Sequence, residues 1–255
     1  MIYLIASASS SLFGMATGLG AVTLLRPLLD AVSPLSPASI AMLCTMAALG
    51  ASLVSAFFAL SQPIPLHQDD LLMLATGSAL GGILGDLAAA RFMSVLTPAS
   101  VTLLQNALLL TLVALPMLYF THLSGTLRPL GLTRMIAFPL ALGIGLLGSF
   151  LAFGAEPLTL MLFFLLFDAE DDESACAALT IALFSMAGKL LTLLIRERFS
   201  LLDAGILLWL LPGSILGALL AMLPRVQRLP MRTGEALLRF SLFTTLLNMA
   251  AAYLL

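Results

Sequence analysis

Eight apolar segments dominate the chain, and each is long enough to cross a lipid bilayer as a helix. A hydrophobic helix needs about 20 residues to span the ~30 Å hydrocarbon layer. Polar or proline-containing stretches separate the segments, which we place at residues 2–31, 38–60, 71–95, 98–121, 135–167, 174–195, 201–223 and 233–255. No connection between them is long enough to form a domain. We therefore expect an all-α membrane protein with about eight hydrophobic segments.

The composition supports a membrane location. Only 9% of the 255 residues are charged and 61% are hydrophobic, whereas a soluble domain carries about 25% charged residues to cover its surface. The net charge of −2 makes nucleic acid an improbable partner. Cys44 and Cys176 lie in separate apolar runs, so we expect packing residues and no disulfide. The predicted location is the cell (inner) membrane, crossed several times and surrounded by lipid.

Two of the segments, residues 2–31 and 135–167, are longer than the bilayer requires. A helix of about 30 residues extends ~45 Å, well beyond the ~30 Å layer. Both contain a glycine-rich middle, at residues 14–20 and 143–154, and glycine disfavours a regular helix. We expect each long segment to be broken into two half-helices or to be re-entrant.

Short matches at a nearly constant spacing indicate an internal repeat. The stretch 12–21 matches 147–155 at an offset of 134, Gly-Ser-Ala-Leu-Gly at 77–81 matches Gly-Ser-Ile-Leu-Gly at 213–217 at an offset of 136, and 41–45 falls opposite 177–181. The pattern predicts two similar four-segment halves, residues 1–127 and 128–255, within one membrane domain.

Broken helices at corresponding positions of two halves are typical of transporters. A break frees backbone N–H and C=O groups, which are tolerated only where they line protein or a watery cavity. If the long segments cross, each half has four spans and the halves share one orientation. If they fold back as re-entrant hairpins, each half crosses three times and the halves are inverted. We favour broken crossing helices.

The order of these features resembles the sulfite exporter TauE/SafE family of membrane permeases along essentially the whole chain. A glycine-rich apolar segment ends in Pro27-Leu28-Leu29, the 41–45 stretch follows, an acidic pair (Asp69, Asp70) opens the third segment, and the glycines of 77–85 come next, before the plan repeats. The resemblance implies a permease for sulfite, organosulfonates or related small organic anions.

The chain departs from the family pattern at the glycine-rich breaks. Family members usually carry a glycine triplet after residues 18–20, where this chain has Ala21 and Val22. The triplet is also missing from residues 154–157, and Arg26 stands where an apolar residue is usual. We therefore expect a divergent member.

Two ionisable residues within the segments are candidates for transport, because such groups are costly inside a membrane. Glu156 precedes the acidic run of 168–173 by twelve residues, which places it at ~18 Å depth, near the middle of the bilayer. Lys189, the only lysine, would lie ~20–25 Å from the same side. We expect Glu156 to couple to protons or to pair with Lys189, which helps to attract an anion. The alternatives are a structural ion pair or a lysine that reaches to the nearer surface.

The remaining candidates for substrate binding lie beside the breaks. Gly18, Gly20 and Gly154 mark freed backbone, and Thr17, Thr45 and Thr180 stand near it. Most threonines in membrane helices instead return a hydrogen bond to their own helix.

Other polar residues in the segments have simpler interpretations. We favour the membrane edge for Arg26 and a near-interface position for Asp86. We expect Gln105 and Asn106 to hold helices together.

The sequence contains no pattern that indicates catalysis. There is no phosphate loop, no nucleophile elbow and no metal-ligand spacing around His67 or His122. We therefore expect no enzyme, no metal and no cofactor. The leading hypothesis is a secondary transporter of a small anion, driven by H⁺ or Na⁺. The alternative is a membrane-embedded scaffold or assembly protein without transport activity. Basic residues divide evenly between the two sides, and we choose cytoplasmic termini. The oligomeric state is left open.

Overall fold

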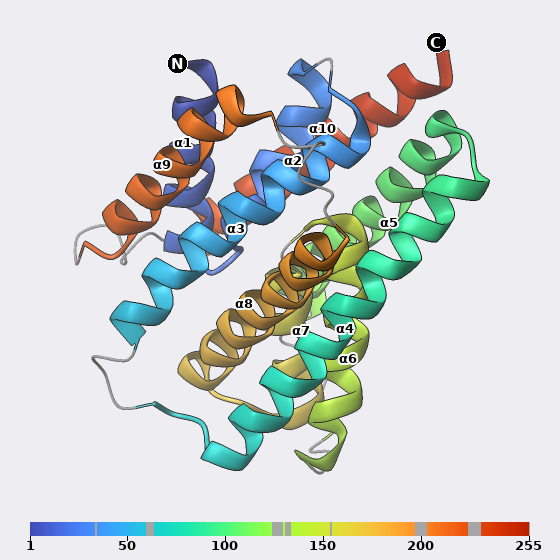
Figure 1. Cartoon of the computed structure of the whole chain (residues 1–255). Coiled ribbons are helices and arrows are strands. Elements are labelled where there is room, and N and C mark those ends of the chain that lie inside the picture. The colour runs from blue at the N-terminus through green and yellow to red at the C-terminus, as the bar shows by residue number, and fades with distance from the viewer. Residues whose placement is uncertain are drawn as a thin grey trace.

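The computed structural model describes residues 1–33, 35–59, 64–123, 130, 134–153, 155–196, 203–223 and 231–254, and within these ranges the chain is helical (Figure 1). The helices are α1 (Ile2–Ala16), α2 (Val22–Val32), α3 (Pro37–Ala59), α4 (Gln68–Val95), α5 (Pro98–Leu118), α6 (Ala137–Leu151), α7 (Glu156–Phe167), α8 (Asp171–Ile195), α9 (Ala204–Ala221) and α10 (Met231–Leu254), with a π-helical turn at Tyr119–Leu123 and a 3₁₀ turn at Arg134–Ile136. The expected all-α membrane protein is confirmed, and both long segments are broken.

Five described helices, α3, α4, α5, α8 and α9, are long and apolar enough to cross a membrane. Helix α10 adds 24 residues. In contrast, the four products of the two broken segments have 15, 11, 15 and 12 residues. At 1.5 Å per residue each is about 16 to 23 Å long, too short to cross the ~30 Å layer alone.

Helix α1 runs parallel to α9 in close backbone contact. A Cβ added at Gly213 would lie 2.6 Å from the Leu4 carbonyl oxygen, and one turn later a Cβ at Gly217 would meet the carbonyl oxygen of Ala8. Between these two contacts α1 and α9 both advance by four residues, so the two helices run in the same direction. The glycines therefore allow the two helices to approach until side chains no longer separate them.

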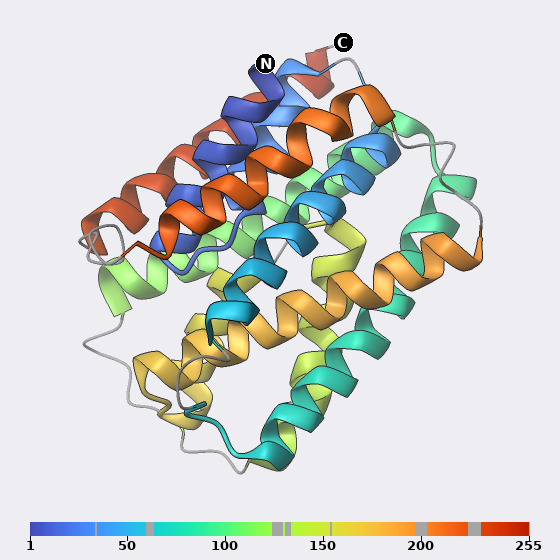
Figure 2. The ribbon, with the colours of Figure 1, turned by 60° about the vertical axis from the view of Figure 1, so that its left-hand side comes forward.

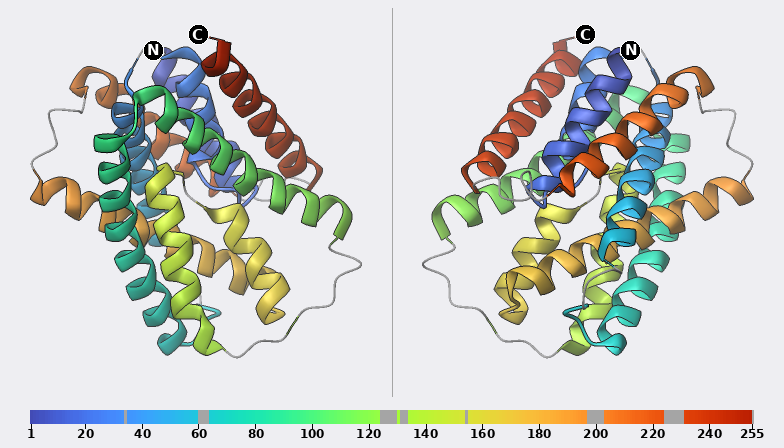
Figure 3. Two further views of the ribbon diagram at one scale, coloured as in Figure 1. Left: turned by 90° about the vertical axis from the view of Figure 1, so that its right-hand side faces the viewer. Right: turned by 90° about the vertical axis from the view of Figure 1, so that its left-hand side faces the viewer.

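Helix α2 runs parallel to α10, which returns in the direction opposite to α9 (Figure 3). The hydroxyl of Ser241 donates to the Thr23 carbonyl at 2.8 Å, and the Asn248 amide donates to the Pro27 carbonyl at 2.9 Å. Helices α1 and α2 are therefore antiparallel, and the first long segment is a hairpin that enters and leaves at the end of the bundle where both termini lie (Figure 2).

The second long segment forms an equivalent hairpin from the opposite end of the bundle. Helix α6 lies parallel to α4, since a Cβ at Gly77 would meet the Phe138 carbonyl oxygen at 2.7 Å and one at Gly81 would meet the carbonyl oxygen of Leu142. Helix α7 then returns toward the end from which α6 came (Figure 3). The tips of the two hairpins meet inside the bundle.

The favoured layout of broken crossing helices is therefore wrong, and the re-entrant alternative is correct. The physical reason lies in the tip of the first hairpin. Gly18 and Gly20 adopt left-handed φ angles of 72° and 84°, which turn the chain back where a single kink would let it continue. The Leu19 and Gly20 amides both donate to the Gly14 carbonyl, at 2.8 and 3.0 Å, and so end α1.

The repeat noted in the sequence has counterparts in these contacts. In the second hairpin the Phe153 amide donates to the Gly148 carbonyl at 2.9 Å, at the same offset of 134 from the Leu19–Gly14 bond. The contact of Gly77 with Phe138 likewise corresponds to that of Gly213 with Leu4. Each hairpin thus packs on helices from the other part of the sequence. The predicted boundary between residues 127 and 128 lies outside the described residues and stays a prediction.

Local sequence signals explain several helix ends. Asp203 caps α9 by accepting from the Gly205 and Ile206 amides at 2.9 and 3.1 Å. Helix α8 starts with acidic residues in its first turn, which complements the partial positive charge of a helix N-terminus. Cys44 and Cys176 are both free, as expected.

Candidate functional site

The two hairpin tips meet at Glu156 and Gly20. Glu156 is the first residue of α7, and its carboxylate lies directly against the α carbon of Gly20 at the end of the first hairpin tip. A Cβ added at Gly20 would coincide with the carboxyl group of Glu156. Position 20 therefore requires glycine both for its left-handed backbone and for the space that the carboxylate fills.

A cavity of about 490 Å³ opens at this junction. It is lined by the first hairpin tip, the C-terminal end of α3, the start of α7 and the first turns of α8. Residues 64 and 65, before α4, and Met222, after α9, complete the lining. The lining residues are Met15, Gly18, Gly20, Ser55, Phe58, Ala59, Ile64, Pro65, Glu156, Asp172, Ala175, Cys176, Ala178, Leu179 and Met222. Three predicted site residues, Gly18, Gly20 and Glu156, are thus brought together in one cavity of a size suited to a small solute.

Two buried polar atoms in the cavity lack a hydrogen-bond partner among the described residues. They are Oε2 of Glu156 and Oγ of Ser55, whose residues are 7% and 6% exposed. An unsatisfied buried polar group is costly, and such groups in native proteins are usually matched by water, an ion or a ligand. These two atoms therefore mark the polar part of the cavity.

Two helix N-termini are directed to the same junction. Neither α2, with Ala21 at its N-cap position, nor α7, with Ala155, has a side-chain hydrogen bond that caps its first turn. The first amides of a helix lack intrahelical partners and carry the positive end of the helix dipole. Such termini bind anions, so the junction offers the first amides of α2 and those of α7 other than Pro157, which has no N–H, to a negatively charged group.

The cavity has no basic side chain among its described lining residues. Its ionisable groups are Glu156, the thiol of Cys176 and Asp172, which is exposed at the rim. An anion in this cavity would therefore be attracted only by the two helix N-termini, and the ionised side chains of the cavity would repel it.

Lys189, predicted to bind substrate, lies elsewhere. Its ammonium group is buried and donates to the Ser149 carbonyl at 2.6 Å, and no ion pair joins Lys189 to Glu156. Ser149 lies in the last turn of α6, and its carbonyl also accepts the Ala152 amide, at 3.1 Å. The structure thus places the lysine at the negative end of a half-helix.

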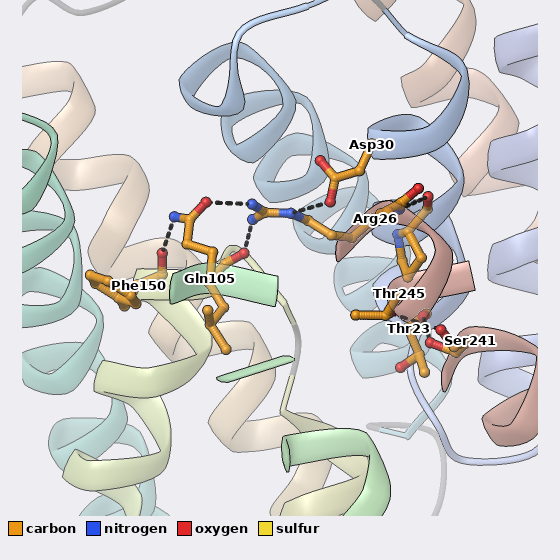
Figure 4. A network of polar contacts seen from close by, with 10 residues as sticks. Thr23, Arg26, Asp30, Gln105, Phe150, Ser241 and Thr245 are labelled. Atoms are coloured by element: carbon orange, nitrogen blue, oxygen red, sulfur yellow. Dashed lines mark hydrogen bonds and ion pairs between the residues drawn. The ribbon is translucent and has the colours of Figure 1, made fainter. Parts of the chain in front are cut away.

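Arg26 and Gln105 complete this cap at the C-terminal end of α6 (Figure 4). The Arg26 guanidinium donates to the Leu151 carbonyl and, at 2.8 Å, to the side-chain oxygen of Gln105. Gln105 in turn donates to the Phe150 carbonyl at 3.3 Å. The carbonyls of Ser149, Phe150 and Leu151 therefore receive hydrogen bonds from α8, α5 and α2, respectively.

Each of the two buried cations has a carboxylate nearby, which is partly buried for Arg26 and buried for Lys189. Arg26 contacts Asp30 at 3.4 Å. Asp86 interacts electrostatically with Lys189 and accepts a 2.7 Å hydrogen bond from Thr192. Arg26 is 3% exposed and Asp86 5%, so both are enclosed by protein; their expected positions at the membrane edge and near the interface stay predictions. Gln105 joins helices, as expected.

The three predicted threonines do not line the cavity. Thr17, Thr45 and Thr180 donate to carbonyls of their own helices, to Phe13, Ala41 and Cys176, at 2.8, 2.7 and 2.8 Å. This is the alternative that the sequence left open. Gly154, the remaining candidate, lies outside the described residues.

Sequence analysis missed Ser55 and Cys176 as lining residues. Both stand in apolar helices, and they line the cavity together with residues of the first hairpin tip, which is far away in the sequence. The small residues that surround Ser55, in particular Gly50 and Ser52, are the one signal that could have suggested a packed, inward face of α3.

Comparison with known proteins assigns the family. No curated protein and no solved structure matches the chain. A family model described as the sulfite exporter TauE/SafE matches residues 1–253. The match covers nearly the whole chain, and the helical membrane fold agrees with it. The chain belongs to the sulfite exporter TauE/SafE family.

Proposed function

We propose that this protein is a secondary transporter that moves sulfite, an organosulfonate or a related small organic anion across the cell (inner) membrane, with the anion bound in the cavity between the hairpin tips. The family is one of membrane transporters of sulfite or related anions. The substrate within this class, the direction of transport and the coupling ion, H⁺ or Na⁺, belong to the proposal. So does the cytoplasmic location of both termini.

One observation carries the assignment of the site. A cavity of about 490 Å³ lies where the uncapped N-termini of α2 and α7 converge, and two of its lining residues, Glu156 and Ser55, each have a buried polar atom without a partner in the described part of the chain. Broken helices whose N-termini point at an anionic group are the binding device of several transporter folds. The amides in the first turns of α2 and α7, except at Pro157, which has no N–H, and the Ser55 hydroxyl would supply donors for the oxygen atoms of a sulfite or sulfonate group.

Transport can be tested with the purified full-length protein in proteoliposomes. We expect uptake of at least one of radiolabelled sulfite, sulfoacetate and taurine above protein-free vesicles, and competition among those that are transported. A membrane scaffold, the alternative function, predicts no flux of any of the three. Absence of flux with an imposed pH gradient and with an imposed Na⁺ gradient would overturn the proposal.

The position of the site can be tested independently through Cys176, which lines the cavity and is partly accessible, whereas Cys44 is fully buried. In a Cys44→Ala background a maleimide should modify Cys176, and the transported anion should slow the reaction. The matched control is Cys176→Ala with Cys44 retained, which should not react in the folded protein. Modification that proceeds at the same rate with saturating anion would place the site elsewhere.

A further inference from the structure

The carboxylate of Glu156 occupies the place that an anion would take in the candidate site. It lies against the backbone of Gly20, one residue before the N-cap of α2, and belongs to the first residue of α7. It is therefore beside both uncapped N-termini at once. Negatively charged groups are stabilised at such positions, yet Oε2 has no hydrogen-bond partner among the described residues.

We propose that Glu156 is an internal competitor of the transported anion, and that the anion binds only when a proton neutralises this carboxylate. The inference rests on the proposed function and deepens it, because it names the proton as the coupling ion. The proton adds to the Glu156 carboxylate from the water that fills the cavity. The helix N-termini are then available to the substrate, because the neutral carboxyl group no longer competes for them.

The charges that surround Glu156 support this competition. The cavity contributes Asp172 and the Cys176 thiol from α8. The nearby cations do not compensate, because Lys189 of α8 is bound to the Ser149 carbonyl and Arg26 of α2 is bound to the Leu151 carbonyl and to Asp30.

An anion added beside an ionised Glu156 would therefore meet a like charge that no basic residue in the cavity offsets. Two unit charges about 4 Å apart at an effective dielectric constant of about 20 repel by about 4 kcal/mol, which weakens binding by about a thousandfold.

Only a glycine at position 20 leaves room for the Glu156 carboxylate at the hairpin tip. Any side chain at Gly20 would collide with all three atoms of the Glu156 carboxyl group. At Gly18, the other left-handed glycine of the tip, an added Cβ would lie 3.5 Å from Leu160, an ordinary contact. The space over Gly20 is thus specific to the carboxylate, and the same space would admit a substrate oxygen once the carboxyl group moves away.

The test measures protons taken up per anion bound. Titration calorimetry of the wild type with sulfoacetate, in pairs of buffers of different ionisation enthalpy at several pH values from neutral to alkaline, should show proton uptake that approaches one proton per anion at the alkaline end, where the carboxylate is ionised before the anion binds. Sulfoacetate is suitable because both of its acidic groups are ionised under these conditions. Glu156→Gln should bind sulfoacetate without proton uptake and with an affinity independent of pH. In vesicles it should exchange anions but no longer accumulate them under a pH gradient.

A matched control is Asp171→Asn, which removes an exposed carboxylate of α8 outside the cavity lining and should keep the proton uptake. Glu156→Asp, which keeps an acid at the tip, should also keep it and serves if the glutamine variant does not fold. Proton uptake that persists in Glu156→Gln would overturn the inference, and so would binding to the wild type without proton uptake. In the latter case transport itself would stand. A wild type that neither binds nor transports any anion would contradict the proposed function and this inference together.

Discussion

The ammonium group of Lys189 donates to the main-chain carbonyl of Ser149, in the last turn of α6, at 2.6 Å. The only lysine of the chain thus caps a half-helix that ends inside the bundle. A half-helix that stops in an apolar layer leaves carbonyl groups without partners, and a cation at this end also stabilises the helix dipole. This relationship accounts for a buried charge that the sequence associated with substrate binding.

Lys189→Met should destabilise the protein. The substitution leaves the Ser149 carbonyl with the Ala152 amide as its remaining donor, at 3.1 Å, and leaves Asp86 without its nearby cation. Breaking a buried charge arrangement costs about 3 to 5 kcal/mol. We expect a clear fall in the midpoint of thermal unfolding of the detergent-solubilised protein. Arg91→Met is the matched control, because Arg91 is exposed at the end of α4, and it should change stability by less than about 0.5 kcal/mol. An unchanged midpoint with complete loss of flux would instead support substrate binding by Lys189.

Arg26 should act together with Gln105. Arg26→Gln removes the donor to Leu151, Gln105→Leu removes the donor to Phe150, and either change leaves the other residue without one of its partners. In a double-mutant cycle on thermal stability we expect a coupling energy of about 0.5 to 3 kcal/mol. Strictly additive effects would show that the two side chains do not form one unit. Arg26→Lys should not restore stability, since a lysine lacks the planar fork that reaches several acceptors.

The contrast between Arg26 and Glu156 shows how far the sequence could predict the site. Glu156 was identified as a candidate because an ionisable residue within an apolar segment is energetically costly, and its position beside a glycine-rich break is visible in the sequence. Arg26 was assigned to the membrane edge because Asp30 follows it by one turn. Its other partners are the Leu151 main-chain carbonyl, 125 residues away, and the Gln105 side chain, 79 residues away. Main-chain acceptors have no sequence signal. Ser55 was missed for the same reason, since its place in the cavity depends on a tip contributed by another helix.

The fold was predictable up to the direction of the half-helices. Segment length, glycine content and the repeat at offsets of 134 and 136 predicted eight apolar segments and two breaks, which the structure confirms. Whether a break bends or reverses the chain depends on φ angles at Gly18 and Gly20, and glycine permits both outcomes. The packing of α1 on α9 and of α6 on α4 then fixes the hairpins, and these are long-range contacts.

The glycines at these two interfaces should be intolerant of even one methyl group. A Cβ at Gly81 would meet the backbone of Leu142 and Leu146, and one at Gly217 would meet Ala8 and Ser11. We expect Gly81→Ala and Gly217→Ala to destabilise the protein by about 1 to 3 kcal/mol each, because overpacking forces the helices apart. Both should lower the thermal midpoint and the yield of monodisperse protein.

Gly143→Ala is the internal control for this pair. Nothing lies within 4 Å of an added Cβ at this position of α6, and alanine is favoured over glycine in a helix by up to about 1 kcal/mol. We therefore expect unchanged or slightly raised stability. A similar loss at all three positions would mean that the destabilisation is a property of glycine replacement in these helices and does not arise from the contacts between α1 and α9 or between α4 and α6.

Gly18 and Gly20 should respond differently to alanine, although both have left-handed backbones. The left-handed conformation costs a residue with a Cβ about 1 to 2 kcal/mol at either position. At Gly20 the methyl group must also displace the Glu156 carboxylate, whereas at Gly18 it meets only an ordinary contact with Leu160. We expect Gly18→Ala to keep measurable anion flux. Gly20→Ala should abolish the flux and should lower the midpoint of thermal unfolding more than Gly18→Ala does.

A cycle with Glu156→Ala separates the two effects at Gly20. If the clash with the carboxylate is the cause, Gly20→Ala should cost less stability in the Glu156→Ala background than in the wild type, because the space over residue 20 is then empty. Backbone strain alone predicts the same loss in both backgrounds, since it depends on the φ angle of residue 20 and not on its neighbour. Thermal unfolding of the four proteins decides between the two causes, and equal losses would remove the argument that the fold reserves this space for Glu156.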